Sequence, residues 1–107
     1  MEIKQYEIVL VSLDPTMGSE ISKTRPCLVI SPNEMNNHLG TVVVAPMTTT
    51  IKQYPTRVSI THNNKKGSAA IDQIRTIDKR RIQKVIGKIP AEEINQCKSV
   101  IRETYVD

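Results

Sequence analysis

Short apolar runs rich in valine and isoleucine constrain the fold of this chain more than any other feature of its sequence. They cover Glu7–Leu13, Cys27–Ser31 and Thr41–Met47, and a proline lies near the end of each run or within two residues of it. Runs of this length and composition, bounded by turn residues, are typical of buried β-strands. The sequence therefore predicts a mainly β fold.

The rest of the chain predicts more strands and a short helical turn. Strands are predicted at Arg57–Thr61, Ser68–Ile74 and Lys84–Ile89. The segment 62–67 between the first two reads HNNKKG, which is typical of a turn. One short helical turn is predicted within the polar stretch 32–40, which separates two of the apolar runs.

A terminal helix is predicted from Pro90. Its first turn holds this proline together with Glu92 and Glu93, which suit the positive end of a helix dipole. Apolar residues then recur at spacings of three and four, as on a buried helix face: Ile94, Cys97, Ile101 and Tyr105. Five or six short strands with one terminal helix indicate a small curled sheet or a partly open barrel.

The length of 107 residues predicts a single domain, residues 1–107, with one core. The core is expected to be aliphatic, because the chain has no phenylalanine or tryptophan and only three tyrosines. The N-terminal segment carries Glu2, Lys4 and Glu7 among its apolar residues, so it is expected to be neither a signal sequence nor a membrane span. We expect a cytoplasmic protein with no membrane contact.

No cofactor and no metal site are predicted. The two cysteines, Cys27 in an apolar run and Cys97 in the helix, are expected to be buried thiols rather than a disulfide framework. Neither His38 nor His62 has a cysteine, histidine or carboxylate at a spacing that metal sites use. The sequence thus favours chemistry carried out by side chains alone.

The charge balance favours a polyanionic partner. Basic residues outnumber acidic ones by 15 to 11, which gives a net charge of +4 and a pI near 9.2. The densest basic segment, 75–88, is either a solvated face or a surface that steers a nucleic acid by its phosphates. The absence of phenylalanine and tryptophan argues against a platform on which single-stranded bases stack.

Arg25 stands between a long polar loop and a buried strand. The loop, Asp14–Thr24, has eleven residues, against about 4 to 6 in a typical connection, and long loops on small domains are often functional. Pro26 follows the arginine directly. Arg25 is therefore either a strand-end charge whose head reaches solvent, or a guanidinium held rigidly so that it binds a phosphate through two hydrogen bonds.

Polar residues at two further places are candidates for binding or catalysis. Residues 48–50 are three threonines, which form either a surface turn or a source of hydroxyl donors for a phosphate. Asp72 and Gln73 are adjacent in a predicted strand, where alternation directs only one of them toward the core. Asp72 is expected either to be exposed or to pair with an arginine such as Arg25 or Arg75.

Four segments of the sequence, taken in their order and spacing, resemble those of a known protein family. They read VSLDPTMGSE, TRPCLVISP, VVVAPMTT and DQIRTID. In order and spacing, over about residues 6–86, they resemble the MazF/PemK family of toxin endoribonucleases from bacterial type II toxin–antitoxin pairs. The resemblance implies a small Src homology 3-like barrel of five to seven short strands with a C-terminal helix.

The resemblance also implies an activity, partners and catalytic residues. Members of the family form homodimers and cut single-stranded RNA at short sequences without a metal ion. An antitoxin silences them by laying its C-terminal tail in the RNA groove, and the toxin–antitoxin complex binds DNA. The family's catalytic arginine before a proline and its threonine after the third strand match Arg25 and Thr48. Asp72 matches an aspartate that some members add, but the arginine two positions before it in those members is Ala70 here.

The cleavage implied by the resemblance uses the 2′-hydroxyl of the RNA as nucleophile and gives a 2′,3′-cyclic phosphate and a 5′-hydroxyl end. Arg25 and Thr48 are expected to stabilise the negative charge on the phosphorane. An arginine is a poor base because its side chain stays protonated, whereas Glu20 and Asp72 are more ordinary bases. The hypothesis is that Arg25 mainly stabilises charge and can also donate a proton, with Glu20 assisting as the base. The residues predicted to contact RNA are Ser19, Thr49, Asp72, Gln73, Arg75, Lys79 and Arg80.

Two other functions stay open on the sequence. A non-catalytic toxin of the CcdB type shares the fold but poisons DNA gyrase by binding it, an activity tied to a C-terminal Trp-Gly-Ile ending. This chain ends in Tyr105, Val106 and Asp107 and has no tryptophan. An RNA-binding barrel without cleavage activity also fits, because Arg25 and Thr48 can hold a phosphate without catalysis.

Overall fold

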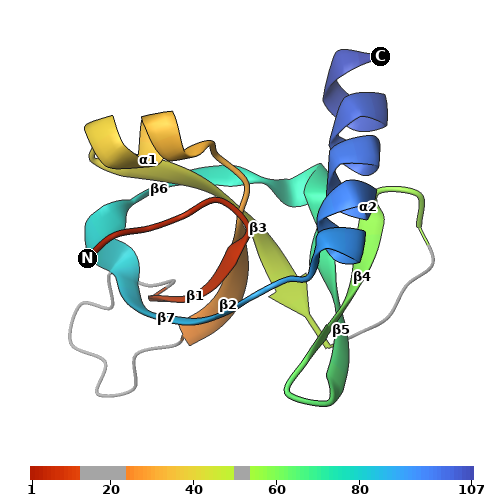
Figure 1. The fold of residues 1–107 in the computed structure, drawn as a ribbon, viewed down its shortest axis with the longest axis horizontal. Helices are drawn as coiled ribbons and strands as arrows, with labels where there is room; N and C mark the ends of the chain where they lie inside the picture. Colours follow the sequence, from red (N-terminus) through yellow and green to blue (C-terminus); the bar gives the residue numbers. More distant parts are fainter. Residues whose placement is uncertain (13–23, 50–53) are drawn as a thin grey trace.

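The structure is a computed structural model that describes residues 1–12, 24–49 and 54–107. These residues form a curled antiparallel sheet, a short helix α1 and a C-terminal helix α2 (Figure 1). The strands are β1 Glu7–Ser12, β2 Thr24–Val29, β3 Thr41–Thr48, β4 Arg57–His62, β5 Lys65–Ala70, β6 Arg75–Asp78 and β7 Ile82–Lys88. The helical elements are α1 Asn33–His38, α2 Ala91–Ile101, a π-helical continuation Arg102–Val106, and 3₁₀ turns at Ile71–Gln73 and Lys79–Arg81.

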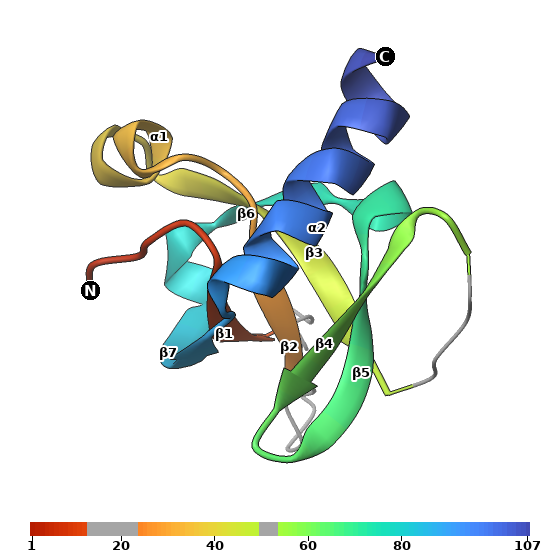
Figure 2. The ribbon, with the colours of Figure 1, turned by 45° about the vertical axis from the view of Figure 1, so that its right-hand side comes forward.

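The sheet curls because β3 changes partner along one of its edges. The strand order is β4-β5-β3-β2-β1-β7, and β6 pairs with β3 beside this path. On that edge, Thr41–Val44 pairs with β6, whereas Met47 and Thr48 pair with β5. The change of partner sets the β4–β5 hairpin apart from the other strands, so that it folds across them (Figure 2).

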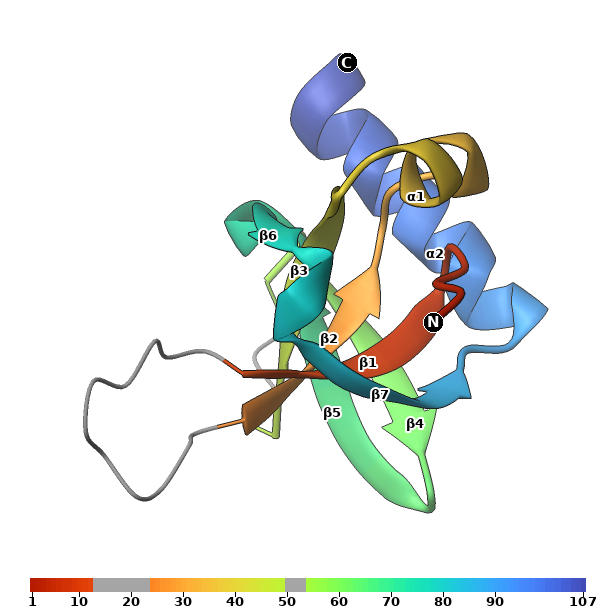
Figure 3. The same cartoon turned by 90° about the vertical axis from the view of Figure 1, so that its left-hand side faces the viewer.

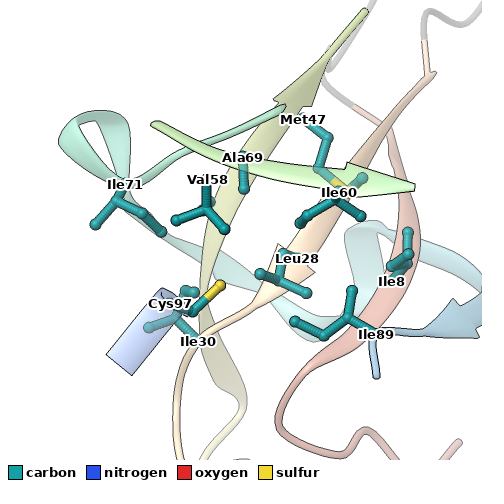
Figure 4. Close-up of a cluster of buried hydrophobic side chains, with 11 residues drawn as sticks. Ile8, Leu28, Ile30, Met47, Val58, Ile60, Ala69, Ile71, Ile89 and Cys97 are labelled. Carbon is teal, nitrogen blue, oxygen red and sulfur yellow. The ribbon is translucent and has the colours of Figure 1, made fainter. Parts of the chain in front are cut away.

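Two hydrophobic clusters lie on opposite faces of the central strands, and Figure 4 shows the larger one. Ile8 and Leu28 belong to this larger cluster, whereas their chain neighbours Val9 and Cys27 belong to the other. Successive residues of a strand point to opposite faces, so the central strands need apolar side chains at adjacent positions. This two-sided burial explains the unbroken apolar runs of the sequence and confirms the aliphatic core.

Helix α2 packs against β4 and the turn Ile71–Gln73 (Figure 1). Ile94, Cys97 and Ile101 pack on the core as predicted, whereas Tyr105, predicted for the same buried face, is 49% exposed. Cys97 of this helix is fully buried. The Tyr105 hydroxyl donates a 2.6 Å hydrogen bond to the carbonyl oxygen of Ile71. Oε2 of Glu93 accepts a 3.1 Å hydrogen bond from the backbone N–H of Thr61 on β4. No helix in the described ranges is long and apolar enough to cross a membrane.

One predicted strand is wrong over part of its length. The prediction ran from Ser68 to Ile74, but β5 ends at Ala70, and a 3₁₀ turn and the separate strand β6 follow. Because β5 pairs with the end of β3 and β6 with its beginning, the chain must step along β3, and the turn makes this step. The seven strands found in residues 1–12, 24–49 and 54–107 exceed the five or six of the sequence pattern and agree with the family resemblance.

The connection between β4 and β5 is tighter than the predicted turn segment 62–67. Asn63 and Asn64 have φ angles of 52° and 62°, the left-handed region that asparagine tolerates. They form a two-residue turn, and His62 pairs directly with Lys65. The lysines that follow the turn therefore lie on β5 rather than in a loop.

Both cysteines are buried free thiols, as predicted. Burial raises the pKa of Cys27 to about 11, although the positive charges of Arg25 and Arg75 act in the other direction. Burial and the negative charge of Glu93 raise the pKa of Cys97 to about 12. Since the thiolate is the reactive form, both side chains are inert in the folded protein at neutral pH.

The two ends of the strand order come together where the ring of His62 lies against Gly87. Strands β4 and β7 stand at opposite ends of the order, and the curl of the sheet brings β7 back toward β4 (Figure 3). A Cβ atom at Gly87 would lie 2.3 Å from Cε1 of His62. Glycine at this position thus makes room for the imidazole.

Replacing Gly87 with alanine is expected to lower the free energy of unfolding by about 1 to 3 kcal/mol, because the new methyl group overlaps the ring. The same substitution in a His62→Ala background should cost much less, since the overlapping ring is gone. Urea unfolding of the four proteins, followed by circular dichroism, measures this coupling. Equal losses in the two backgrounds would show that the ring does not restrict position 87.

Candidate functional site

A groove of about 590 Å³ lies where β2 begins and β3 ends. The β4–β5 hairpin and β7 complete its walls. Among the described residues, the groove is lined by Ile8, Thr24, Arg25, Pro26, Met47, Thr48, Thr49, His62, Asn63, Lys65, Lys66, Gly67 and Ile86. The lining therefore combines apolar side chains from the core with basic and hydroxyl side chains.

Arg25 and Thr48 lie on the neighbouring strands β2 and β3. The pairing of these two strands begins at Cys27 and Pro46, so Arg25 and Thr48 each lie two residues beyond it. Both residues line the groove, and both also line a second hollow of about 320 Å³ that Gln73 borders. The two predicted catalytic residues are thus neighbours between two hollows.

The backbone on each side of this pair is held by well-packed neighbours. Arg25 pairs with the buried residue Val11 of β1, and the following Pro26 has a fixed φ, while the arginine side chain itself is exposed. Thr48 pairs with β5, where a Cβ atom at Gly67 would lie only 2.8 Å from the Thr48 carbonyl oxygen. A rigid backbone therefore carries two polar side chains at the rim of the groove.

The groove is electropositive. Arg25, Lys65 and Lys66 line it, and none of its described lining residues is an aspartate or a glutamate. Within residues 1–12, 24–49 and 54–107, no group of three or more histidine, cysteine or acidic side chains is placed to hold a metal ion. The site as described can attract an anion and donate hydrogen bonds to it.

Asp72 is ion-paired, but not with either of the arginines expected. It lies on the 3₁₀ turn after β5, where its Oδ1 accepts a 3.0 Å hydrogen bond from Nε of Arg57. The sequence left open whether Asp72 is exposed or pairs with an arginine such as Arg25 or Arg75. It is exposed and pairs with a different arginine, because it lies on a turn beside β4 rather than within a strand. Burial alone would raise the pKa of Asp72, but hydrogen bonds from Arg57, the backbone and Thr56 outweigh it and hold the pKa below its ordinary value.

Replacing Arg57 with glutamine is expected to raise the pKa of Asp72, because burial remains while the strongest donor to the carboxylate is lost. A carboxyl group with a lowered folded-state pKa stabilises the fold above its unfolded pKa of about 3.9 and loses this effect as the pH falls through the lowered value. NMR titration of the Asp72 carboxyl carbon in both proteins measures the change. An unaltered midpoint in the variant would contradict the role given to Arg57.

Two more of the predicted RNA contacts lie near Arg25. Gln73 lines the second hollow together with Arg25 and Thr48. Arg75 begins β6, opposite Val44 of β3, and its positive charge reaches Cys27, as does the charge of Arg25. The structure therefore gathers these residues around the beginning of β2.

Lys79 and Arg80 lie elsewhere. They follow β6 beside the beginning of β3, which is about 23 Å along the strand from Thr48 at about 3.3 Å per residue. The ammonium group of Lys79 donates to the carbonyl oxygen of Asn36. The guanidinium of Arg80 forms an ion pair of 2.8 Å with Asp78, whose pKa hydrogen bonds from Arg80 lower to about 2. These two cations are therefore separated from the groove within one chain.

Some of the remaining predicted residues line the groove, and others lie outside the residues that the structure describes. Thr49 lines the groove next to Thr48. Ser19 and Glu20 lie outside the described residues, as does Thr50. The assignment of Glu20 as the base therefore stays a prediction from the sequence.

Sequence reasoning missed the contribution of the β4–β5 hairpin to the site. His62, Asn63, Lys65 and Lys66 all line the groove, although their sequence pattern is that of an ordinary turn. The adjacent asparagines were a usable signal, because this pair favours a two-residue hairpin turn with strands on both sides. A shorter turn would have placed both lysines on a strand beside the site.

Comparison with known proteins gives a family match over nearly the whole chain. Residues 4–105 match the model of a family described as PemK-like, MazF-like toxin of type II toxin-antitoxin system. The chain is 35% identical over 96 residues to the endoribonuclease toxin MazF of Escherichia coli, covering 89% of this chain and 86% of the relative. It is 31% identical over 110 residues to the endoribonuclease MazF9 of Mycobacterium tuberculosis, covering 94% and 93%.

Solved structures share the fold. A crystal structure of MazE-MazF from Deinococcus radiodurans aligns with a TM-score of 0.81 and 25% identity, covering 96% of this chain and 95% of the other. An endoribonuclease in complex with its cognate antitoxin from a mycobacterial species aligns with a TM-score of 0.81 and 22% identity, covering 94% and 92%. The mainly β fold with a C-terminal helix is therefore confirmed.

Proposed function

The chain belongs to the family of PemK-like, MazF-like toxins of type II toxin–antitoxin systems, and we propose that as such a toxin it cuts single-stranded RNA at short sequences without a metal ion. It is an endoribonuclease of the MazF type, by its likeness to the curated relatives. The observation that carries the proposed site is that Arg25 and Thr48 both line an electropositive groove and the hollow next to it.

The proposed reaction is an attack of the RNA on its own backbone. The 2′-oxygen forms a bond to phosphorus and loses its proton, the bond from phosphorus to the 5′-oxygen breaks, and the departing oxygen gains a proton. The products are a 2′,3′-cyclic phosphate and a 5′-hydroxyl end. Arg25 and Thr48 donate hydrogen bonds to the non-bridging oxygens, where negative charge grows in the transition state. Glu20 is proposed to take the proton from the 2′-hydroxyl.

RNA binding is proposed to extend from this pair along both hollows. Thr49 borders the groove and Gln73 borders the second hollow, while Asp72 and Arg75 lie close by. The other proposed contacts are Ser19, Lys79 and Arg80. Because a long single strand can pass from one subunit to the next, contacts that are distant within one chain fit a homodimer.

We further propose a homodimer in the cytoplasm whose partner is an antitoxin. Relatives of this fold are known as MazE-MazF complexes and as an endoribonuclease with its cognate antitoxin. A C-terminal antitoxin tail laid over Arg25 and the two groove lysines would exclude RNA from the same place. An acidic tail suits this surface, because the described groove lining contains three cations and no acidic residue.

The test is to incubate the purified protein with a long single-stranded RNA in EDTA and to map the new ends. Discrete cuts that leave 5′-hydroxyl ends would support metal-independent, sequence-specific cleavage. Intact RNA that nevertheless shifts in a gel would favour an RNA-binding barrel without activity. Intact and unbound RNA, with inhibition of purified gyrase, would favour the CcdB-type alternative instead.

A further inference from the structure

Arg57 begins β4 and lines the second hollow together with Arg25 and Thr48. Its chain neighbour Val58 is buried in the larger hydrophobic cluster (Figure 4). Successive residues of a strand point to opposite faces, so Arg57 points away from this cluster. It pairs with Ala70 of β5, and paired residues of antiparallel strands point to the same face. Because alanine has a small side chain, it leaves room for the guanidinium beside the hollow.

Two contacts hold the guanidinium of Arg57 in place. Its Nε donates a 3.0 Å hydrogen bond to Oδ1 of Asp72, and its Cζ lies 5.7 Å from the centre of the Tyr54 ring. A cation over the face of an aromatic ring is attracted to it. The side chain of Arg57 is only 14% exposed. The group is therefore positioned before any ligand binds.

The ion pair with Asp72 leaves most donors of Arg57 unused. An arginine has five N–H donors, and the contact with Asp72 uses the one at Nε. No hydrogen bond from Nη1 or Nη2 is found within residues 1–12, 24–49 and 54–107. Asp72 is not among the described residues that line the second hollow. A guanidinium that is fixed and has two free nitrogen atoms suits an anion that accepts two hydrogen bonds.

The charges around the second hollow favour such an anion. Arg25 and Arg57 both line it, and none of its described lining residues is acidic. Two like charges repel each other, and an anion between them turns this repulsion into attraction. Arg25 and Thr48 line the groove as well, so a phosphate bound at this pair lies next to the hollow that Arg57 lines.

We propose that Arg57 is a further catalytic residue, which donates hydrogen bonds from its Nη atoms to a non-bridging oxygen of the phosphate that is cut. Asp72 is the positioning residue that holds the guanidinium at Nε. The inference rests on the proposed function, because it requires RNA held at Arg25 and Thr48. Arg57 adds to the stabilisation of negative charge in the transition state and takes no part in the proton transfers.

The first experiment replaces Arg57 with glutamine, which keeps most of the stem but no charge. Single-turnover cleavage of a short RNA at saturating enzyme should slow by about 10²-fold, while RNA binding changes far less. Arg57→Lys keeps the charge but loses the pair of Nη atoms, so it should recover only part of the rate. Arg102→Gln is the matched control, because it removes the same group from an exposed position after α2.

The second experiment separates a contact with RNA from a merely structural ion pair. Asp72→Asn keeps an oxygen that can accept from Nε of Arg57, so it should slow cleavage by less than about tenfold. Adding Arg57→Gln to Asp72→Asn should slow cleavage by about tenfold or more beyond the single variant. If Arg57 served only to neutralise Asp72, the second substitution would change nothing. Circular dichroism checks the folding of each variant.

The third experiment replaces one non-bridging oxygen of the cut phosphate with sulfur, which accepts hydrogen bonds more weakly. Each of the two isomers then reports on one oxygen. For one isomer, cleavage by the wild-type protein should slow several-fold, whereas Arg57→Gln should respond much less, because its contact is already missing. Equal responses of the two proteins to both isomers would place Arg57 away from this phosphate.

These experiments separate the two levels of the proposal. If the wild-type protein cuts RNA and Arg57→Gln cuts it equally fast, or loses only binding, the role of Arg57 is wrong while the nuclease stands. If the wild-type protein cuts no RNA, the proposed function fails and the role of Arg57 fails with it. A slower chemical step that persists without the Asp72 carboxylate supports Arg57 as a catalytic residue.

Discussion

Replacing Arg25 with alanine is expected to slow RNA cleavage by about 10² to 10³-fold, the usual cost of removing a donor that stabilises charge in a transition state. The folded protein should survive the change, because the side chain of Arg25 is exposed and forms no ion pair among the described residues. Single-turnover cleavage of a short RNA at saturating enzyme measures the effect on the chemical step. Binding measured separately should weaken far less than the rate falls.

Two further variants sharpen this result. Arg25→Lys keeps a positive charge but loses the planar pair of donors, so we expect it to recover only part of the rate. Arg102→Ala removes an equal charge from the exposed end of the C-terminal helix and should leave the rate within about twofold, as a long-range charge effect is largely screened at physiological salt. Equal losses of cleavage rate in Arg25→Ala and Arg102→Ala would show that Arg25 contributes only its positive charge and not its position.

Replacing Gly67 with alanine is expected to slow cleavage by about 10²-fold, although position 67 carries no reactive group. A Cβ atom there would lie 2.8 Å from the carbonyl oxygen of Thr48, so the backbone that holds Thr48 must move. Displacement of a positioned group by about 1 Å can cost this much in rate. The free energy of unfolding should also fall, by about 1 to 3 kcal/mol.

Gly40→Ala is the matched control for Gly67→Ala, because a Cβ atom at Gly40 would have no atom within 4 Å. It should leave both the rate and the free energy of unfolding nearly unchanged. A loss in kcat with little change in KM would identify a displaced Thr48, whereas a loss in stability alone would mean that the backbone recovers its position. Full activity in Gly67→Ala would contradict the positioning role.

Much of the fold could be predicted because its strands are buried on both faces. Val9 and Leu28 lie in different clusters, yet each belongs to an apolar run that is visible in the sequence. The end of β5 could not be predicted, since Ile71 is apolar and buried like the residues before it. Only the pairing of two strands with different parts of β3 shows that the chain must turn there.

The proposed catalytic pair was predictable for a different reason from the rest of the site. Arg25 and Thr48 stand at motif positions of the family resemblance, and the structure adds that they line the same two hollows. His62 and Lys65 belong to no motif, and they reach the groove through the curl of the sheet. The partner of Asp72 could not be predicted either. Asp72 lies on a turn, and the turn, rather than the alternation of side chains along a strand, places its carboxylate beside Arg57.

The two-sided burial of the central strands also divides the chain into parts with different freedom to evolve. A strand that serves a cluster on each face has no solvent side on which substitutions can accumulate, as the opposite placements of Ile8 and Val9 illustrate. The hairpin tip at Asn63 and Asn64 is exposed and contributes to no cluster. New target preferences in this lineage should therefore arise through changes around the hairpin, while the barrel strands stay nearly constant.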